Sequence, residues 1–194
     1  MVNGTQFLLS RKEKWALGES PTSDGKKNRT DANRNESPSY GIIDSQSTKT
    51  LYASEERGID GGKKVKGRKK HIMTDTMGNL LTVVVHAANI HDTKGGIEVA
   101  SRAFDKYPTI EKFCGDEGYR GTFVEYIDCE FDLEVDISER IKPKFEVLPK
   151  RWIVERTLAW LGNSRRLSKD YEISKNSAEN MVFISNLHII LKRY

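Results

Sequence analysis

Three carboxylates stand where a metal-dependent phosphodiester chemistry would need them. Asp44 and Asp116 each end a short apolar run, in the strings GIID and KFCGD, which predicts a side chain at the carboxyl end of a strand. Glu155 lies in a basic helical segment, at the edge of the face that carries Val154. Two divalent ions roughly 4 Å apart can activate an attacking oxygen and neutralise a leaving one, and Mg²⁺ prefers carboxylate oxygens. Because ends of neighbouring parallel strands meet at one crevice, the pattern favours a shared metal site.

Each of these acids also has a local structural interpretation. Asp44 and Asp116 would equally cap the turns that follow them, as aspartates at strand ends often do. Glu155 would pair with Arg151, one helical turn before it, on a solvated face. Other acids also stand near predicted strand ends, namely Asp75, Asp92, Glu117 and Asp136. The pattern alone therefore leaves the choice among these carboxylates open.

Basic residues gather in two segments, although the formal net charge is only +4. The string KKVKGRKK at 63–70 has six basic residues and no acid, and residues 140–169 have nine basic residues against two acids. Clusters of one sign suit a polyanion such as the DNA backbone, whereas charge alone favours a solvated face. The candidate DNA-contacting residues are Lys63, Lys64, Lys66, Arg68, Lys69, Lys70, Arg120, Arg151, Arg156, Arg165 and Arg166.

An alternation of strands and helices is predicted to position these residues. Strands are expected at 41–44, 69–75, 80–88, 110–115 and 133–137, and helices at 92–107, 122–128, 149–162 and from 176 onwards. The second and third strands flank a turn at 76–79 and should form a hairpin, and Glu179 predicts a capping box for the last helix. This order favours an α/β, ribonuclease-H-like mixed sheet of about five strands, the first three antiparallel, with helices on both faces.

The composition indicates one folded domain without a membrane span. Hydrophobic residues make up 37% and charged residues 31% of the 194 residues. No apolar run reaches about 18 residues, and the start lacks the blocks of a signal peptide, so we expect a cytoplasmic protein. Residues 1–36 are polar and are expected to be a disordered or remnant segment, with a short helix possible at 5–17. The domain is expected to span 37–194.

Several conspicuous side chains have structural expectations. Cys114 and Cys129 make a poor disulfide framework, and Cys114 is expected to be a small buried hydrophobe. Trp152 and Trp160 lie eight apart on one predicted helix and are expected in the core rather than stacked on exposed bases. His91 and Asp92 follow the third predicted strand and are expected to cap a loop rather than to contact DNA.

Three long strings in this chain are specific. The first is IIDSQSTKT at 42–50 followed by GGKKVKGRKKHIMTDTMGNL at 61–80. The second is GDEGYRGTF at 115–123, and the third is PKRWIVERTLAWLGNSRRLSKDYE at 149–172, with its glutamate in an Arg-x-x-x-Glu run. In this order they resemble the catalytic domain of DDE-class insertion-sequence transposases, in the group known as insertion sequence family five, which is related to family four. The resemblance covers residues 38–194.

The resemblance implies a site and a reaction. It implies that Asp44, Asp116 and Glu155 are catalytic and bind two Mg²⁺ or Mn²⁺ ions, and that Arg151 positions phosphate beside Glu155. The implied reaction is hydrolysis of a phosphodiester at the transposon end, after which the new 3′ hydroxyl attacks target DNA. The implied partners are double-stranded DNA, at both the transposon ends and the target, and a second copy of the chain in an active homodimer at the bacterial nucleoid.

Two departures from the family pattern leave alternatives. A related group has Tyr three residues before the arginine and Lys seven after the glutamate, where this chain has Leu148 and Gly162; Arg165 and Arg166 would supply the missing charge. Residues 1–36 do not resemble the N-terminal domain that reads terminal repeats in such enzymes. A truncated, non-transposing DNA-binding remnant is therefore the alternative function, and a host nuclease or resolvase on the same fold is a third.

Overall fold

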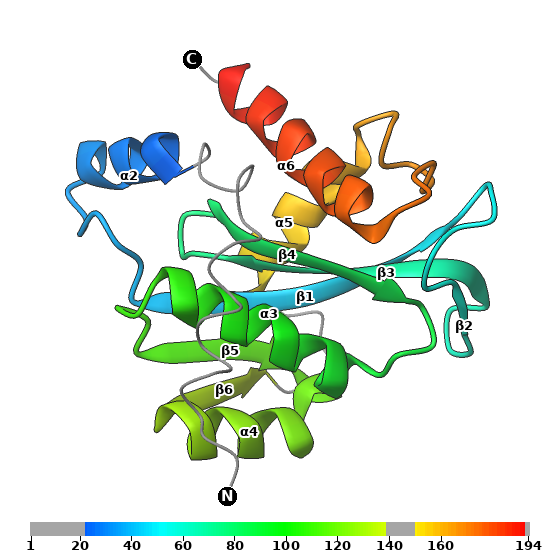
Figure 1. Cartoon of the computed structure of the whole chain (residues 1–194). Coiled ribbons are helices and arrows are strands. Elements are labelled where there is room, and N and C mark those ends of the chain that lie inside the picture. Colours follow the sequence, from blue (N-terminus) through cyan, green and yellow to red (C-terminus); the bar gives the residue numbers. More distant parts are fainter. Residues whose placement is uncertain (1–21, 139–149, 193–194) are drawn as a thin grey trace, which may run out of the picture.

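The computed structural model describes residues 22–138 and 150–192, and Figure 1 shows a central sheet covered by helices. In chain order the elements are α2 (Thr22–Asp31), β1 (Tyr40–Lys49), β2 (Gly58–Asp60), β3 (Val65–Thr74), β4 (Leu80–Ala87), α3 (Asp92–Lys106), β5 (Lys112–Asp116), the 3-10 helix η1 (Glu117–Tyr119), α4 (Thr122–Phe131), β6 (Glu134–Ser138), α5 (Arg151–Gly162) and α6 (Lys175–Leu191).

The sheet is mixed and has β1 at its centre. β1 pairs antiparallel with β3 and parallel with β5, and β5 pairs parallel with β6. β3 pairs antiparallel with β4 along most of its length, and its first residues pair with the short β2. The order β4–β3–β1–β5–β6, with three antiparallel strands and then two parallel ones, is the ribonuclease-H-like topology. The predicted fold class is confirmed, and β2 is a sixth strand that the sequence analysis did not predict.

Neighbouring residues of the central strands point to opposite faces of the sheet and build two separate cores. Ile42 and Ile72 lie in the core beneath α5 and α6, whereas Ile43 and Met73 lie in the core beneath α3 and α4. Each of these four side chains is at most 1% exposed, and full burial of such a side chain contributes about 1.5–3 kcal/mol. Packing on both faces therefore fixes β1, the strand that carries Asp44 (Figure 1).

Helix α2 lies within residues 1–36, the segment expected to be disordered or a remnant. Its sequence TSDGKKNRTD has no apolar period, and a buried ion pair holds it instead. Arg29 Nη1 lies 2.8 Å from Asp75 Oδ2, and both side chains are almost inaccessible to solvent. The polar segment therefore joins the fold from Thr22 onwards. The possible helix at 5–17 lies outside the described residues.

The last helix also begins differently from its prediction. Ser174 caps it and Lys175 is its first residue. Glu179, expected to close a capping box, is buried and accepts hydrogen bonds from the backbone N–H of Val85 and from Arg102. The expected capping box is therefore wrong, because this carboxylate satisfies a buried donor of β4.

Other expectations concern the thiols and the membrane. Both cysteines are free, and Cys114 is 2% exposed, which confirms it as a buried side chain. Over the described ranges, no helix combines the length and apolar character that crossing a bilayer requires.

Candidate active site

Two parallel strands bring Asp44 and Asp116 to one edge of the sheet. The last residue pair between β1 and β5 is Ile42 with Cys114, and each aspartate stands two residues beyond it. β5 ends at Asp116, whereas β1 continues beside β3. The two aspartates therefore lie near each other where β5 stops, at the carboxyl edge of the parallel strands, which is the usual place for a ligand in such a sheet.

Asp44 experiences the charges of both other predicted catalytic acids. Burial raises its pKa to about 6, and the charges of Asp116 and Glu155 add to the rise. The backbone N–H of Ser45, which donates to Asp44 Oδ1 over 2.7 Å, and the guanidinium of Arg151 oppose it. Three acids from β1, β5 and α5 are thus near enough to repel one another.

Asp116 is held by the turn that follows it. Its Oδ1 accepts a hydrogen bond from the backbone N–H of Gly118 over 2.9 Å, at the start of η1. A Cβ at Gly118 would lie 2.9 Å from that same oxygen, so a larger residue would displace the carboxylate. The turn cap weighed for Asp116 in the sequence analysis is present, and the cap leaves its other oxygen to face α5.

Arg151 links the acids of the strand and the helix. Its Nη2 lies 3.5 Å from Asp116 Oδ2 and 3.1 Å from Glu155 Oε1. Its side chain is 15% exposed, against 51% for Glu155, so the cation sits deeper than its helical partner. The pair between Arg151 and Glu155 that the sequence analysis weighed as an alternative therefore exists, and it includes Asp116 as a third member.

These residues match the ligand chemistry of a hard divalent cation. All three offer carboxylate oxygens, the donors that Mg²⁺ and Mn²⁺ prefer, and the raised pKa of Asp44 indicates that added positive charge would be favourable there. Within residues 22–138 and 150–192, no three Asp, Glu, His or Cys side chains are grouped closely enough to hold a metal as they stand. Arg151 instead contacts two of the acids, so metal binding requires them to draw together.

The competing acids are mostly engaged elsewhere. Asp75 pairs with Arg29, and Asp136 accepts a hydrogen bond from the hydroxyl of Tyr40 over 2.6 Å. Asp92 is different, because it lies beside the site and contacts Ser45. Asp92 was one of several acids near predicted strand ends, and the local sequence around Asp92 does not indicate its contact with Ser45.

Three residues of the candidate DNA-contacting set are buried in ion pairs or hydrogen bonds. Arg68 is 0% exposed and pairs with Asp170 at 2.9 Å, and Lys69 pairs with Asp92 at 2.9 Å. Lys70 donates to a backbone carbonyl of the loop after α5. The prediction that these three residues contact DNA is therefore wrong, because they lie on β3 with their side chains buried inside the domain.

The other basic candidates remain near the surface. The ion pair between Arg68 and Asp170 fastens the loop after α5 to β3, and Thr50 at the end of β1 bridges to Asp170. This loop and the β2–β3 hairpin therefore lie at the same end of the sheet. The exposed members of the set are Lys63, Lys64, Lys66, Arg120, Arg165 and Arg166.

The tryptophans of α5 lie outside both cores, contrary to expectation. Trp152 is 41% exposed, and Trp160 is partly buried. The guanidinium of Arg156 lies 4.5 Å from the centre of each ring, and it also donates to the backbone carbonyl of Met77. The apolar residues beside them, such as Val154, take the core positions instead. Arg156 therefore ties α5 to the β3–β4 turn.

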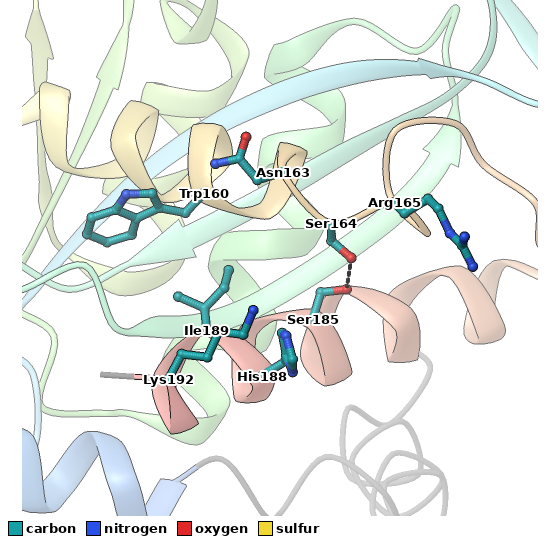
Figure 2. Close-up of a pocket in the computed structure, with 8 residues that line it drawn as sticks. All are labelled: Trp160, Asn163, Ser164, Arg165, Ser185, His188, Ile189 and Lys192. Carbon is teal, nitrogen blue, oxygen red and sulfur yellow. Dashed lines mark hydrogen bonds between the residues drawn. The ribbon is translucent and has the colours of Figure 1, made fainter. Parts of the chain in front are cut away.

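An open pocket of about 520 Å³ separates the end of α5 from α6. Figure 2 shows the hydrogen bond between the hydroxyls of Ser164 and Ser185 that joins its two walls. Arg165 and Trp160 contribute to its lining, and none of the three catalytic candidates does. The carboxylate site is thus distinct from this pocket.

His91 does cap α3, as expected for the dipeptide at 91–92. Its side chain accepts a hydrogen bond from the backbone N–H of Thr93. Asp92, the first residue of α3, instead joins the polar network around Ser45 and Lys69.

Sequence comparison gives two findings. A family model described as "Transposase DDE domain" matches residues 35–191. The chain is also 32% identical over 119 residues to a "Putative transposase for insertion sequence element IS402" from Burkholderia cepacia, over 55% of this chain and 54% of that protein. The chain thus spans about half the length of this curated relative.

Structure comparison gives distant likenesses. The catalytic core domain of BIV integrase has a TM-score of 0.44 and 9% identity, over 77% of this chain and 81% of that chain. The HTLV-2 integrase catalytic core domain in complex with magnesium has a TM-score of 0.45 and 16% identity, over 77% of this chain and 83% of that chain. With TM-scores below 0.5, the fold assignment depends on the sheet topology and not on these likenesses. The family match over residues 35–191 covers most of the chain, and the chain therefore belongs to the transposase DDE domain family.

Proposed function

We propose that this chain catalyses metal-dependent hydrolysis of a phosphodiester at transposon ends and strand transfer into target DNA. The observation that carries the proposal is the convergence of three acids around Arg151. Arg151 contacts Asp116 and Glu155, and the charges of these two acids help to raise the pKa of Asp44. Family membership supports the same assignment.

In this proposal the two carboxylates on strands and the one on a helix have different roles. Asp44 and Asp116 are fixed by strands and by backbone N–H groups, so they would hold cations in a constant place. Glu155 is half exposed on α5 and would close on the cations from the helix. Two bound Mg²⁺ or Mn²⁺ ions would supply the charge that activates the attacking oxygen and neutralises the leaving one.

Arg151 has a second role in the proposal. It neutralises two acids in the metal-free arrangement. When cations take over that charge, its guanidinium would be released to hold a phosphate beside Glu155, by the paired N–H geometry that suits phosphate oxygens. The exposed basic residues at the same end of the sheet would bind the DNA backbone without reading sequence.

Cleavage of DNA bearing the element's terminal repeats tests the proposal. With Mg²⁺ or Mn²⁺ the protein should nick such DNA and join the new 3′ end to target, and Asp116→Asn should lower the rate by at least about 10²-fold. Asp136→Asn is the matched control, since this aspartate also lies on a parallel strand but pairs with Tyr40; it should leave cleavage intact.

Three results would contradict the proposal. Unchanged cleavage by Asp116→Asn would exclude the carboxylate triad. DNA binding with no cutting in the unaltered protein would favour a DNA-binding remnant. Cutting of branched or hybrid substrates with no joining would favour a host nuclease.

A further inference from the structure

Asp92 lies beside the candidate site and is held by groups from two strands. Its Oδ1 accepts hydrogen bonds from Lys69 Nζ over 2.9 Å and from Ser45 Oγ over 3.0 Å. The ring Nε2 of His71 lies 3.4 Å from the same oxygen. Asp92 is the first residue of α3, so it joins that helix to β1 and β3.

The contact with Ser45 connects Asp92 to the first catalytic acid. Ser45 is 9% exposed, and its hydroxyl and its backbone N–H donate hydrogen bonds to two different aspartates. The hydroxyl donates to Asp92, and the N–H donates to Asp44 Oδ1 over 2.7 Å. A single residue therefore transmits the position of Asp92 to the carboxylate of Asp44.

Asp92 also borders the turn that holds the second catalytic acid. Its Oδ2 lies 3.6 Å from the point where a Cβ on Gly118 would stand. The backbone N–H of Gly118 donates to Asp116 Oδ1. Asp92 thus bonds to the residue after Asp44 through one oxygen, and its other oxygen lies near Gly118 in the turn after Asp116.

The groups beneath Asp92 are rigid. Lys69 is 6% exposed and donates also to the backbone carbonyl of Ile90, which fixes the start of α3. His71 is 0% exposed and its Nδ1 lies 2.8 Å from Nε2 of His86 on β4. A carboxylate anchored on two buried strands is suited to orient its neighbours rather than to move itself.

We infer that Asp92 is a positioning residue for the metal-binding carboxylates. It orients Asp44 through Ser45 and confines the turn of Asp116 at Gly118, while Lys69 holds it in place. Groups that orient ligating carboxylates through hydrogen bonds tune metal affinity strongly. The inference rests on the proposed function, because it assigns a role toward the cations that Asp44 and Asp116 would bind.

Titration of the full chain with Mn²⁺ alone, following free Mn²⁺ by electron paramagnetic resonance, tests the inference without DNA. Asp44→Asn defines the binding that belongs to this site. Ser45→Ala keeps the ion pair between Asp92 and Lys69 but removes the hydroxyl through which Asp92 holds Ser45, whereas Asp92→Asn removes the negative charge from both of these contacts. Each should weaken Asp44-dependent Mn²⁺ binding by about tenfold or more.

Thermal melting separates positioning from a purely structural role. Asp92→Asn should lower Tm, because Lys69 loses its negatively charged partner. Ser45→Ala should instead melt close to the unaltered protein and still bind Mn²⁺ weakly. Glu179→Gln removes the charge of another largely buried ion pair, with Arg102, and should leave Mn²⁺ affinity unchanged.

The possible failures are distinguishable. Normal Mn²⁺ affinity in folded Ser45→Ala and Asp92→Asn, with Asp44-dependent binding intact, would overturn the inference and leave the proposed function standing. If Asp92→Asn does not fold, Ser45→Ala alone decides. Absence of Asp44-dependent binding in the unaltered protein would overturn the proposed function, and this inference with it.

Discussion

The carboxylate of Asp44 is unfavourable to the folded protein while no cation is bound. Burial and the charges of Asp116 and Glu155 raise its pKa to about 6, and the single guanidinium of Arg151 does not offset them. Sites whose charges are arranged for a ligand commonly cost stability in its absence. At this residue, function and stability therefore have opposite requirements.

Asp44→Asn should stabilise the metal-free protein in a pH-dependent way. Because the folded-state pKa is raised, the carboxyl contributes stability below its ordinary pKa of 3.8 and loses that contribution as the pH rises through about 6. The amide has no charge to bury, so the variant should be more stable by about 1–3 kcal/mol at pH 8 and by a smaller margin at pH 5. Urea unfolding in the presence of a chelator at the two pH values measures the difference.

Asp136→Asn gives the opposite sign and serves as the control. Burial acts to raise the pKa of Asp136, but hydrogen bonds from Tyr40 and Lys112 outweigh it and leave the pKa lowered. Its ionised form therefore stabilises the fold, and the amide should be less stable than the acid at pH 8. Equal effects at Asp44 and Asp136 would mean that burial and repulsion do not govern Asp44.

Sequence patterns predicted single residues well where the signal is local. Asp116 ends β5 as predicted, whereas the strand predicted at 41–44 was too short, because β1 continues to Lys49 and Asp44 lies in its middle. Burial of Arg68 and Lys69 could not be predicted, because their partners Asp170 and Asp92 are remote in the chain. A run of cations indicates an exposed surface only when no distant acid neutralises it.

At the scale of elements, one buried ion pair joins α2 to the sheet. Its residues have no apolar face, so packing contributes little, and Arg29 reaches from it to the buried carboxylate of Asp75. Asp75 also organises the β3–β4 turn by accepting from the backbone N–H groups of Met77 and Asn79. The helix and the turn are therefore stabilised by the same carboxylate.

Arg29→Ala should destabilise the protein by about 2–4 kcal/mol, because it leaves the charge of Asp75 buried without its cation. Chemical unfolding measures the loss, and amide hydrogen exchange should show that α2 and the β3–β4 turn lose protection together. Lys26→Ala is the matched control on the same helix, since Lys26 pairs with Glu36 at the surface; it should cost about 1 kcal/mol or less. A similar small loss for both variants would show that the buried pair does not hold α2.

Periodicity predicted the elements that have an apolar face and missed those that do not. The β3–β4 hairpin was predicted from two apolar runs around a tight turn, and its pairing is confirmed. Helix α2 was missed because an ion pair takes the place of the apolar stripe. In α6 the buried residues include Glu179, Ser185 and Asn186 beside Ala178 and Val182, while Ile184 is 57% exposed. Apolar spacing alone therefore did not predict the buried face, to which Glu179 adds a hydrogen bond from β4.

At the scale of the whole molecule, positive charge is concentrated at one end of the sheet. The β2–β3 hairpin lies at the start of β3, and the β3–β4 turn lies at its other end, roughly 30 Å away for a ten-residue strand. The loop after α5 is fastened to the hairpin end through Arg68 and Asp170. Although the net charge is only +4, exposed basic residues therefore gather at the end of the sheet that lies beyond Asp44.

The salt dependence of DNA binding can locate the basic end that contacts phosphates. Replacing Lys63, Lys64 and Lys66 together by Gln should weaken binding to any duplex, independently of its sequence, and should reduce the slope of log K against log [salt] by about 2–3, since each phosphate contact contributes roughly 0.9. Filter binding or fluorescence anisotropy from low to moderate salt measures that slope. The matched control replaces Lys26, Lys27 and Lys106 by Gln. These three residues lie toward the other end of β3, and their replacement removes the same net charge. If both triple variants change the slope equally, DNA affinity depends on the total charge of the protein and the basic end has no special role. If only the hairpin variant changes the slope, the duplex lies along the face that leads to Asp44, Asp116 and Glu155.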